Sequence, residues 1–237
     1  MRSSSVTAIS LGMLLVASAS SQAQDHVYNL NGTLADAFGG PSLSTLGGSL
    51  AASGFTFGFN EGLSLTGVVG STYTIAMRFR FDEVSGYRRI IDFKDRASDN
   101  GPYVLSGASN FYPTVTGPTA PYVPNTLGLT IFTRDAAGLF SAYFGGALQY
   151  SFLDAGNEGV RSVNTVRFFQ DDLSVGNEAS AGFVNYIATW NSALTQAQVA
   201  AFVPGTPTTT VPEPATFVLL GAGMLMAGLV QRCKRTT

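Results

Sequence analysis

The most regular pattern along this chain of 237 residues is a strict alternation of apolar and polar side chains. Between Tyr73 and Val84 the apolar residues fall on every second position, at Tyr73, Ile75, Met77, Phe79 and Phe81. Because successive side chains of a β-strand point to opposite faces, this spacing predicts a half-buried antiparallel strand. The five apolar side chains are expected to face the core.

Shorter segments with the same pattern follow one another, separated by Gly, Asn, Asp and Pro. This arrangement is typical of an all-β sandwich. Residues 134–138 and the pair Gly145-Gly146 each join two alternating segments, which predicts hairpins. The predicted strands cover residues 27–30, 55–59, 63–65, 73–84, 88–94, 103–105, 127–133, 139–144, 148–152, 165–170 and 182–190.

Three stretches depart from alternation. Residues 38–53 are rich in Gly, Ser and Leu and are expected to be irregular. Residues 110–125 contain four prolines, which cannot donate to a strand ladder, so a long loop or ragged edge is expected. Thr195 and Gln198 form a capping box, which predicts a short helix reaching Phe202.

The N-terminal segment has the organisation of a secretory signal peptide. Met1-Arg2 is basic, residues 6–19 are apolar, and Ser21-Gln22-Ala23 offers a small-x-small cleavage site, with residues 17–19 as the rival site. We therefore expect residues 1–23 to be a signal peptide rather than a buried helix. The exported body would begin near Gln24.

The C-terminal segment contains a second apolar run, residues 215–230, without any charge. A helix of that length spans roughly 24 Å, slightly less than the ~30 Å hydrocarbon core of a bilayer, so length alone fits either a short membrane span or a buried helix. The basic residues that follow, Arg232, Lys234 and Arg235, favour a transmembrane helix with its basic end in the cytoplasm.

The order of Pro212-Glu213-Pro214, an apolar helix, a basic cluster and the chain end over residues 212–237 resembles the PEP-CTERM sorting signal. The resemblance implies a Gram-negative-type bacterium that makes extracellular polysaccharide, transient anchoring in the inner membrane, processing by an exosortase, and delivery to the cell surface or extracellular matrix. The alternative is an ordinary C-terminal anchor with incidental prolines. Residues 204–211, rich in Pro and Thr, are expected to form an extended linker.

Composition narrows the possible partners and chemistry. Residues 24–211 hold nine basic and fourteen acidic side chains, a net charge of −5, which leaves no basic face for nucleic acid or anionic lipid. The single cysteine, Cys233, lies in the tail, so the body has no disulfide. The single histidine, His26, argues against histidine-based triads and zinc sites.

Residues 171–199 resemble the end of a LamG-like, concanavalin A-like lectin/glucanase domain. The shared features are a closing strand with an aromatic residue, an Asn turn, the tripeptide Ala193-Leu194-Thr195 and a short helix. The resemblance implies a two-sheet antiparallel jelly roll over residues 24–203. Trp190, at the end of the last predicted strand, is expected in the core.

Glycoside hydrolysis needs two carboxyl groups across a sugar ring. Glucanases of this fold carry them on one strand in a Glu-x-Asp-x-Glu pattern. No glutamate of the body is followed two residues later by Asp, so no catalytic residue is assigned; the four are Glu61, Glu83, Glu158 and Glu178.

A calcium site is expected instead at the loop that follows the strand of residues 165–170. Calcium needs several oxygen ligands in one place, and this loop offers four: Asp171, Asp172, Asn177 and Glu178. The alternative is a solvated acidic loop. A second acidic loop provides a weaker set of oxygen ligands: Asp92, Asp95, Asp99 and Asn100.

Sugar recognition would use exposed aromatic rings beside polar groups. The candidates in or beside the proline-rich stretch are Tyr103, Phe111, Tyr112 and Tyr122. The alternative is that these rings cap the core. Taken together, the sequence predicts an exported, surface-sorted, non-catalytic binding module for polysaccharide or surface proteins. A purely structural coat protein and a glycan-active enzyme are the alternatives.

Overall fold

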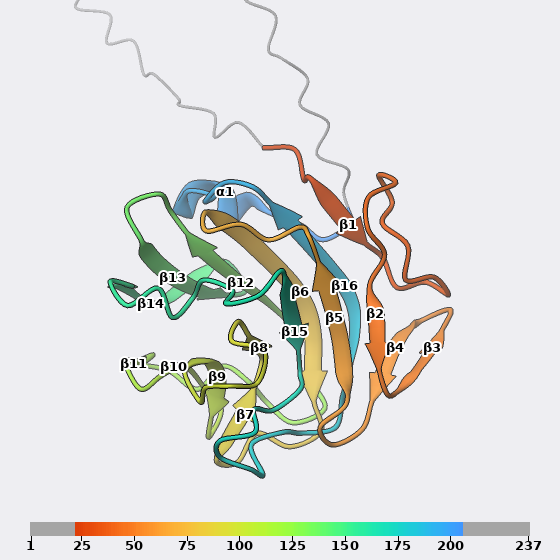
Figure 1. Ribbon diagram of the computed structural model, residues 1–237, viewed down its shortest axis with the longest axis horizontal. Coiled ribbons are helices and arrows are strands. Elements are labelled where there is room, and N and C mark those ends of the chain that lie inside the picture. Colours follow the sequence, from red (N-terminus) through yellow and green to blue (C-terminus); the bar gives the residue numbers. More distant parts are fainter. Residues whose placement is uncertain (1–21, 206–237) are drawn as a thin grey trace, which may run out of the picture.

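Two layers of antiparallel β-sheet pack face to face in the computed structural model, which describes residues 22–205 (Figure 1). The larger layer has eight strands in the order β14-β13-β12-β6-β16-β4-β3, with β1 beside the second half of β16. Its strands are β1 (His26–Tyr28), β3 (Ser49–Ala51), β4 (Gly54–Phe57), β6 (Tyr73–Phe81), β12 (Gly128–Arg134), β13 (Leu139–Phe144), β14 (Ala147–Leu153) and β16 (Gly182–Trp190).

The second layer consists of two four-stranded sheets, β2-β5-β15-β8 and β11-β10-β9-β7. Ile90 joins them, because its N–H donates to Pro102 O and its C=O accepts from Phe169 N. The segment from β7 to β8 therefore changes partner at this residue. The strands are β2 (Ser44–Leu46), β5 (Gly62–Thr66), β7 (Tyr87–Arg89), β8 (Ile91–Asp92), β9 (Gly101–Leu105), β10 (Ala108–Tyr112), β11 (Val115–Thr116) and β15 (Thr165–Phe168).

One aromatic-rich core fills the space between the layers. The alternating residues of β6 are all buried there, as the sequence predicts. Phe79 packs against the rings of Phe81, Phe169 and Tyr122, at centroid distances of 5.1, 5.1 and 6.1 Å. Since residues 24–211 contain no cysteine, burial of such side chains is the main stabilising term of the body.

A second, smaller cluster covers the outer face of the larger layer. The only helix among residues 22–205, α1 (Gln196–Ala201), begins with the predicted capping box of Thr195 and Gln198. The helix places Val199 in an apolar cluster with Trp190, Tyr186 and Ala76, and the indole of Trp190 is 1% exposed. Trp190 is therefore a core residue, as expected.

The described structure confirms an all-β sandwich of antiparallel sheets. Both predicted hairpins form, and Gly145 and Gly146 adopt φ angles of 57° and 84°, which glycine reaches without steric cost. One expectation about irregular stretches is corrected, because residues 38–53 contain the short strands β2 and β3. Residues 110–125 contain the end of β10 and the two-residue edge strand β11, followed by a loop, which fits the expected ragged edge.

The predicted signal peptide falls almost entirely outside the described residues, as do the transmembrane helix and most of the linker. Within residues 22–205, no helix combines the length and hydrophobicity that a bilayer span requires. Both ends of the described chain lie near α1 and β1, and β7 lies at the opposite end of the sandwich (Figure 1).

We predict that Phe79→Ala lowers the free energy of unfolding of residues 22–205 by ~3–5 kcal/mol, because it removes a fully packed ring from the inter-layer core. Chemical denaturation measures this change. Arg78→Ala, at the neighbouring exposed position of β6, is the control and should stay within ~0.5 kcal/mol. Equal effects of the two substitutions would mean that β6 presents the other face to the core.

Candidate functional site

A polar and aromatic site lies on the outer face of β7, β9 and β10. The register pairs Arg89 with Tyr103, and Tyr103 in turn with Asn110. Residues two apart on a strand share a face, so Tyr87 and Tyr112 lie on this side too. The intervening residues Val104 and Phe111 belong to the inter-layer core.

Arg89 organises this face. Its side chain is fully buried, and its guanidinium carbon lies 4.1 Å from the centroid of the Tyr103 ring, a cation–π distance. The guanidinium forms a buried ion pair with Asp172 and lies 3.6 Å from Asp99 Oδ1. Its Nη1 donates to Asn100 O at 3.1 Å. A buried cation with these partners holds two loops against the sheet.

The first of these loops, residues 171–178, is folded around two buried carboxylates. Asp171 accepts the N–H of Asp172 on Oδ1 and the N–H of Glu178 on Oδ2. Asp172 Oδ1 accepts the N–H groups of Ser174 and Val175. Asp171 and Asp172 are 2% and 3% exposed, so the alternative of a solvated loop is wrong for these two residues.

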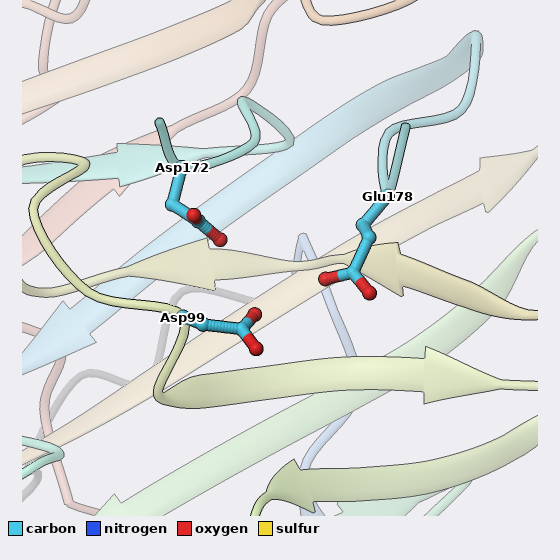
Figure 2. Close-up of side chains that lie close together, drawn as sticks. All are labelled: Asp99, Asp172 and Glu178. Carbon is cyan, nitrogen blue, oxygen red and sulfur yellow. The ribbon is translucent and has the colours of Figure 1, made fainter. Parts of the chain in front are cut away.

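Three carboxyl groups meet where the loops come together. One oxygen of each of Asp99, Asp172 and Glu178 lies within 4.8 Å of the others, and the side chains of Asp172 and Glu178, from the loop 171–178, converge with that of Asp99 from the other loop (Figure 2). We call these residues the carboxylate trio. Asp99 Oδ1 also accepts the hydroxyl of Tyr103 at 2.6 Å, whereas Glu178 Oε2 is buried without a hydrogen-bond partner.

Two members of the carboxylate trio have pKa values shifted in opposite directions. Burial, and then the negative charge of Asp99, raises the pKa of Glu178 to about 7. Burial by itself also raises the pKa of Asp172, but the N–H groups of Val175 and Ser174, together with Arg89, hold it below its ordinary value. At about pH 7 Glu178 is therefore partly protonated, while Asp172 is ionised.

Two tyrosines form an aromatic wall beside the trio. The rings of Tyr87 and Tyr112 meet edge to face at 5.6 Å, and each also contacts the ring of Tyr103. Tyr87 and Tyr112 are partly exposed, as are Asp99 and Glu178. We call these four residues the outer patch.

The other three candidate aromatic residues are buried, but not in the same place. Tyr103 and Phe111 are 0% exposed and Tyr122 is 9% exposed, so in this structure their faces are closed to a ligand. Phe111 and Tyr122 belong to the inter-layer core, as the alternative expected, whereas Tyr103 lies on the outer face of β9, where the guanidinium of Arg89 covers its ring. Tyr112 is the one of the four that remains accessible.

The structure brings together residues from both of the predicted sets of calcium ligands. Only Asp172 and Glu178 of the first set join the trio, because Asp171 is engaged by loop backbone and Asn177 is exposed. From the second set Asp99 joins them. The others have separate partners: Asp92 accepts the N–H groups of Lys94 and Arg96, Asp95 pairs with Arg167, and Asn100 accepts from Arg89.

Sequence reasoning missed Arg89 and Tyr87. Tyr87 lies just before the predicted strand of residues 88–94. Arg89 lies inside that strand, where the sequence pattern does not distinguish it from its neighbours. The one local signal was a basic pair, Arg88-Arg89, in a body with nine basic side chains. The sorting residues Pro212, Glu213, Pro214, Arg232, Lys234 and Arg235 lie outside the described residues.

Comparison with known proteins identifies the tail. Residues 210–235 match the PEP-CTERM protein-sorting motif. The chain therefore carries the sorting signal that the sequence predicts. No curated protein matches the chain significantly.

Solved structures share the fold of the body at low sequence identity. Domain 4 of AbnA, a GH43 extracellular arabinanase from Geobacillus stearothermophilus solved with arabinotriose, aligns with a TM-score of 0.55 at 14% identity over 76% of this chain and 98% of that one. The sialidase of Trypanosoma rangeli aligns with a TM-score of 0.57 at 12% identity, over 79% of this chain and 35% of the sialidase.

Botulinum neurotoxin type C, whose cell entry depends on interaction with two ganglioside molecules, aligns with a TM-score of 0.55 at 14% identity. The match covers 75% of this chain and 50% of that chain. At these identities the comparisons show a shared β-sandwich fold. Their names assign no ligand to this chain.

The raised pKa of Glu178 predicts a pH-dependent stability. A carboxyl group whose pKa rises on folding keeps its proton to a higher pH in the folded state, so its contribution is complete below the unfolded pKa and lost as pH rises through the folded pKa. We expect stability to fall between pH 4.5 and about 7 for this reason. Glu178→Gln should flatten that part of the profile in thermal melts.

Glu158→Gln is the matched control for this experiment, because Glu158 is another partly exposed carboxylate and pairs with Lys94. It should keep the profile of the unmodified chain. Parallel profiles for Glu178→Gln and the unmodified chain would show that Glu178 titrates normally.

Proposed function

We propose that this exported, surface-sorted bacterial protein, whose tail carries the PEP-CTERM motif, is a non-catalytic module that binds extracellular polysaccharide. The observation that carries the proposal is the outer patch, where the rings of Tyr87 and Tyr112 stand beside the carboxyl groups of Asp99 and Glu178. An aromatic face packs on the apolar side of a sugar ring, and carboxyl oxygens accept its hydroxyl hydrogens.

The outer patch is held in place by buried contacts, which suits recognition. Arg89, Tyr103 and Asp172 are buried beneath it and fix the loops that carry Asp99 and Glu178. Groups that are positioned before binding lose little conformational entropy when a ligand arrives. The outer patch thus has a small number of accessible polar groups whose positions are fixed by the buried residues beneath them.

The position of the outer patch fits a protein tethered through its tail. β7 lies at the end of the sandwich opposite α1 and the ends of the described chain (Figure 1). While the C-terminal segment holds the chain at a membrane, the outer patch would face away from it. The arabinotriose bound to domain 4 of AbnA and the gangliosides with which botulinum neurotoxin type C interacts support a carbohydrate as the ligand class.

One observation favours a hydrolytic alternative. Glu178, with its pKa of about 7, and ionised Asp172 resemble the acid and the carboxylate of a glycosidase, and their oxygens lie within 4.8 Å. We prefer binding because both oxygens of Asp172 already accept hydrogen bonds, from loop N–H groups and from Arg89. A purely structural coat protein would need neither the outer patch nor its buried support.

We predict that residues 22–205 bind polysaccharides on a glycan array and that the double substitution Tyr87→Ala/Tyr112→Ala weakens binding by roughly 5- to 150-fold. Two ring contacts at ~0.5–1.5 kcal/mol each give this magnitude. The matched control is Phe38→Ala, an exposed aromatic side chain, 58% accessible, on the loop after β1. Equal losses in the two variants, or release of reducing sugars from a bound polysaccharide, would contradict the proposal.

The carboxylate trio is also the place where we propose that calcium binds. Carboxylate oxygens are the ligands that calcium prefers, and Glu178 Oε2 has no partner within the protein. Asp99 and Glu178 would supply most of the ligand oxygens, and Asp172, whose oxygens also accept from the loop and from Arg89, would share its remaining lone pairs and its negative charge with the ion. A cation there would offset the mutual repulsion of the three carboxylates and give sugar hydroxyls a further partner.

At about a hundredfold excess over its Kd, calcium should stabilise residues 22–205 by ~2.7 kcal/mol. For a domain of this size that corresponds to an increase in Tm of roughly 5–10 °C. Asp99→Asn should abolish the increase, while Asp135→Asn, which removes a carboxylate from the β12–β13 turn, should retain it. If calcium does not change the Tm of the unmodified chain, the proposed calcium site is contradicted.

The sorting motif makes a separate prediction about processing by an exosortase. The surface form of the protein should lack residues 215–237, and replacing Pro212-Glu213-Pro214 with alanines should leave the full-length chain in the membrane fraction. Intact-mass analysis of both fractions measures this. Thr208→Ala in the linker serves as the control and should be processed normally, and a surface form that still contains Cys233 would contradict the prediction.

A further inference from the structure

An open groove, separate from the outer patch, lies beside the loop between β6 and β7. It has a volume of about 480 Å³ and is lined by Asp82, Glu83, Val84, Ser85, Ser106 and Pro124. We call it the loop groove. Its volume falls within the ~300–1,000 Å³ typical of small-ligand sites.

Backbone hydrogen bonds fix the three segments that form the loop groove. Ser106 N donates to Gly86 O at 2.8 Å, and Gly107 N donates to Val84 O at 3.1 Å. Asn125 N donates to Phe81 O at 2.8 Å. The β9–β10 turn and the segment before β12 are thereby tied to the end of β6, so the groove is formed before any ligand arrives.

The charges in the loop groove are balanced. Asp82 pairs with Arg80, which also donates to Asn125 Oδ1 at 2.7 Å. Glu83 pairs with Arg88 at 3.0 Å and accepts the hydroxyl of Ser85, and these two interactions hold its pKa below the ordinary value. Two carboxylates, each beside a guanidinium, leave little net charge to attract an ion.

This chemistry matches a neutral sugar. The carboxylates have further lone pairs for hydroxyl hydrogens, and the guanidinium and serine groups can donate to ring and hydroxyl oxygens. Val84 and Pro124 provide an apolar surface for the C–H face of a sugar ring. A uronate would place its negative charge beside Asp82 and Glu83 and is disfavoured.

The loop groove and the outer patch are joined through Arg88. Its Nη1 donates to the backbone oxygens of Tyr87 and Asn177, at 2.7 and 3.3 Å, and its Nη2 pairs with Glu83. Tyr87 and the residue after Asn177, Glu178, belong to the outer patch. One side chain thus contacts the backbone beside the patch and a wall of the groove.

We propose that the loop groove is a second subsite, which binds a neutral sugar unit of the same polysaccharide chain that contacts the outer patch. This inference rests on the proposed binding function and extends it to the ligand class, a neutral polymer that occupies two subsites. Because linked sites add their contributions, affinity should increase with oligosaccharide length.

The test is calorimetric titration of the full-length chain in mild detergent. The probes are dimers and hexamers of the malto-, cello-, xylo- and manno-oligosaccharide series, with oligogalacturonates of the same lengths as the charged comparison. We expect at least one neutral hexamer to bind tenfold or more tighter than its dimer, and tighter than the hexagalacturonate.

Asp82→Asn/Glu83→Gln should reduce the affinity for that hexamer to the level of the dimer. Ser85→Tyr should do the same by filling the groove while both ion pairs remain, which covers the case in which the double variant folds poorly. Glu158→Gln, another carboxylate paired with a basic side chain, is the control and should retain the length dependence.

The outcomes separate the two proposals. Length-dependent binding that survives both groove variants overturns the second subsite while leaving the outer patch as the binding site. Equal binding of the neutral and the charged hexamers overturns the assignment of a neutral sugar. Binding of the charged hexamer alone overturns the neutral subsite and leaves the proposed function, whereas failure of the unmodified chain to bind any probe, neutral or charged, overturns both.

Discussion

The packing of two alternating sheets on one aromatic core is the constraint on which the rest of the structure depends. Without a cysteine in the body, the inward faces of β6, β12 and β16 and of their counterparts in the second layer must supply most of the stability. Each layer also has an outer face, part of which is covered by other segments of the chain. The larger layer covers its outer face with α1 and the Trp190 cluster, whereas the second layer uses loops held by the buried Arg89. The carboxylate trio lies where those loops meet.

The elements predicted correctly from sequence are those with strong local signals. β16 occupies residues 182–190 as predicted, and the capping box starts α1 at the expected residue, because alternation and capping are encoded by near neighbours. β2 and β3 lack alternation, and they form only because β5 and β4 provide partners. The change of partner at Ile90 depends on β9 and β15, which no local pattern specifies.

The sequence indicated that the candidate site would contain acidic side chains, but not which of them come together. The sequence indicated two acidic loops, and each contributes to the trio, but Asp99 and Asp172 are separated by 73 positions and meet only in the folded sandwich. Arg89 compensates their charge. The sequence places it in a predicted strand but does not indicate that its side chain is buried. Burial of that guanidinium beside Tyr103 and Asp172 decides which acidic side chains are turned inward and which remain accessible.

The central claim is that the end of the sandwich opposite α1 binds polysaccharide. Amide NMR spectra of isotopically labelled residues 22–205, recorded with and without fragments of the producing bacterium's own extracellular polysaccharide, test this claim most directly. The account predicts that the largest shift changes map to Tyr87, Asp99, Tyr112 and Glu178, with little change along α1. Changes centred on α1 and Trp190, or spectra that are identical with and without the fragments, would contradict it.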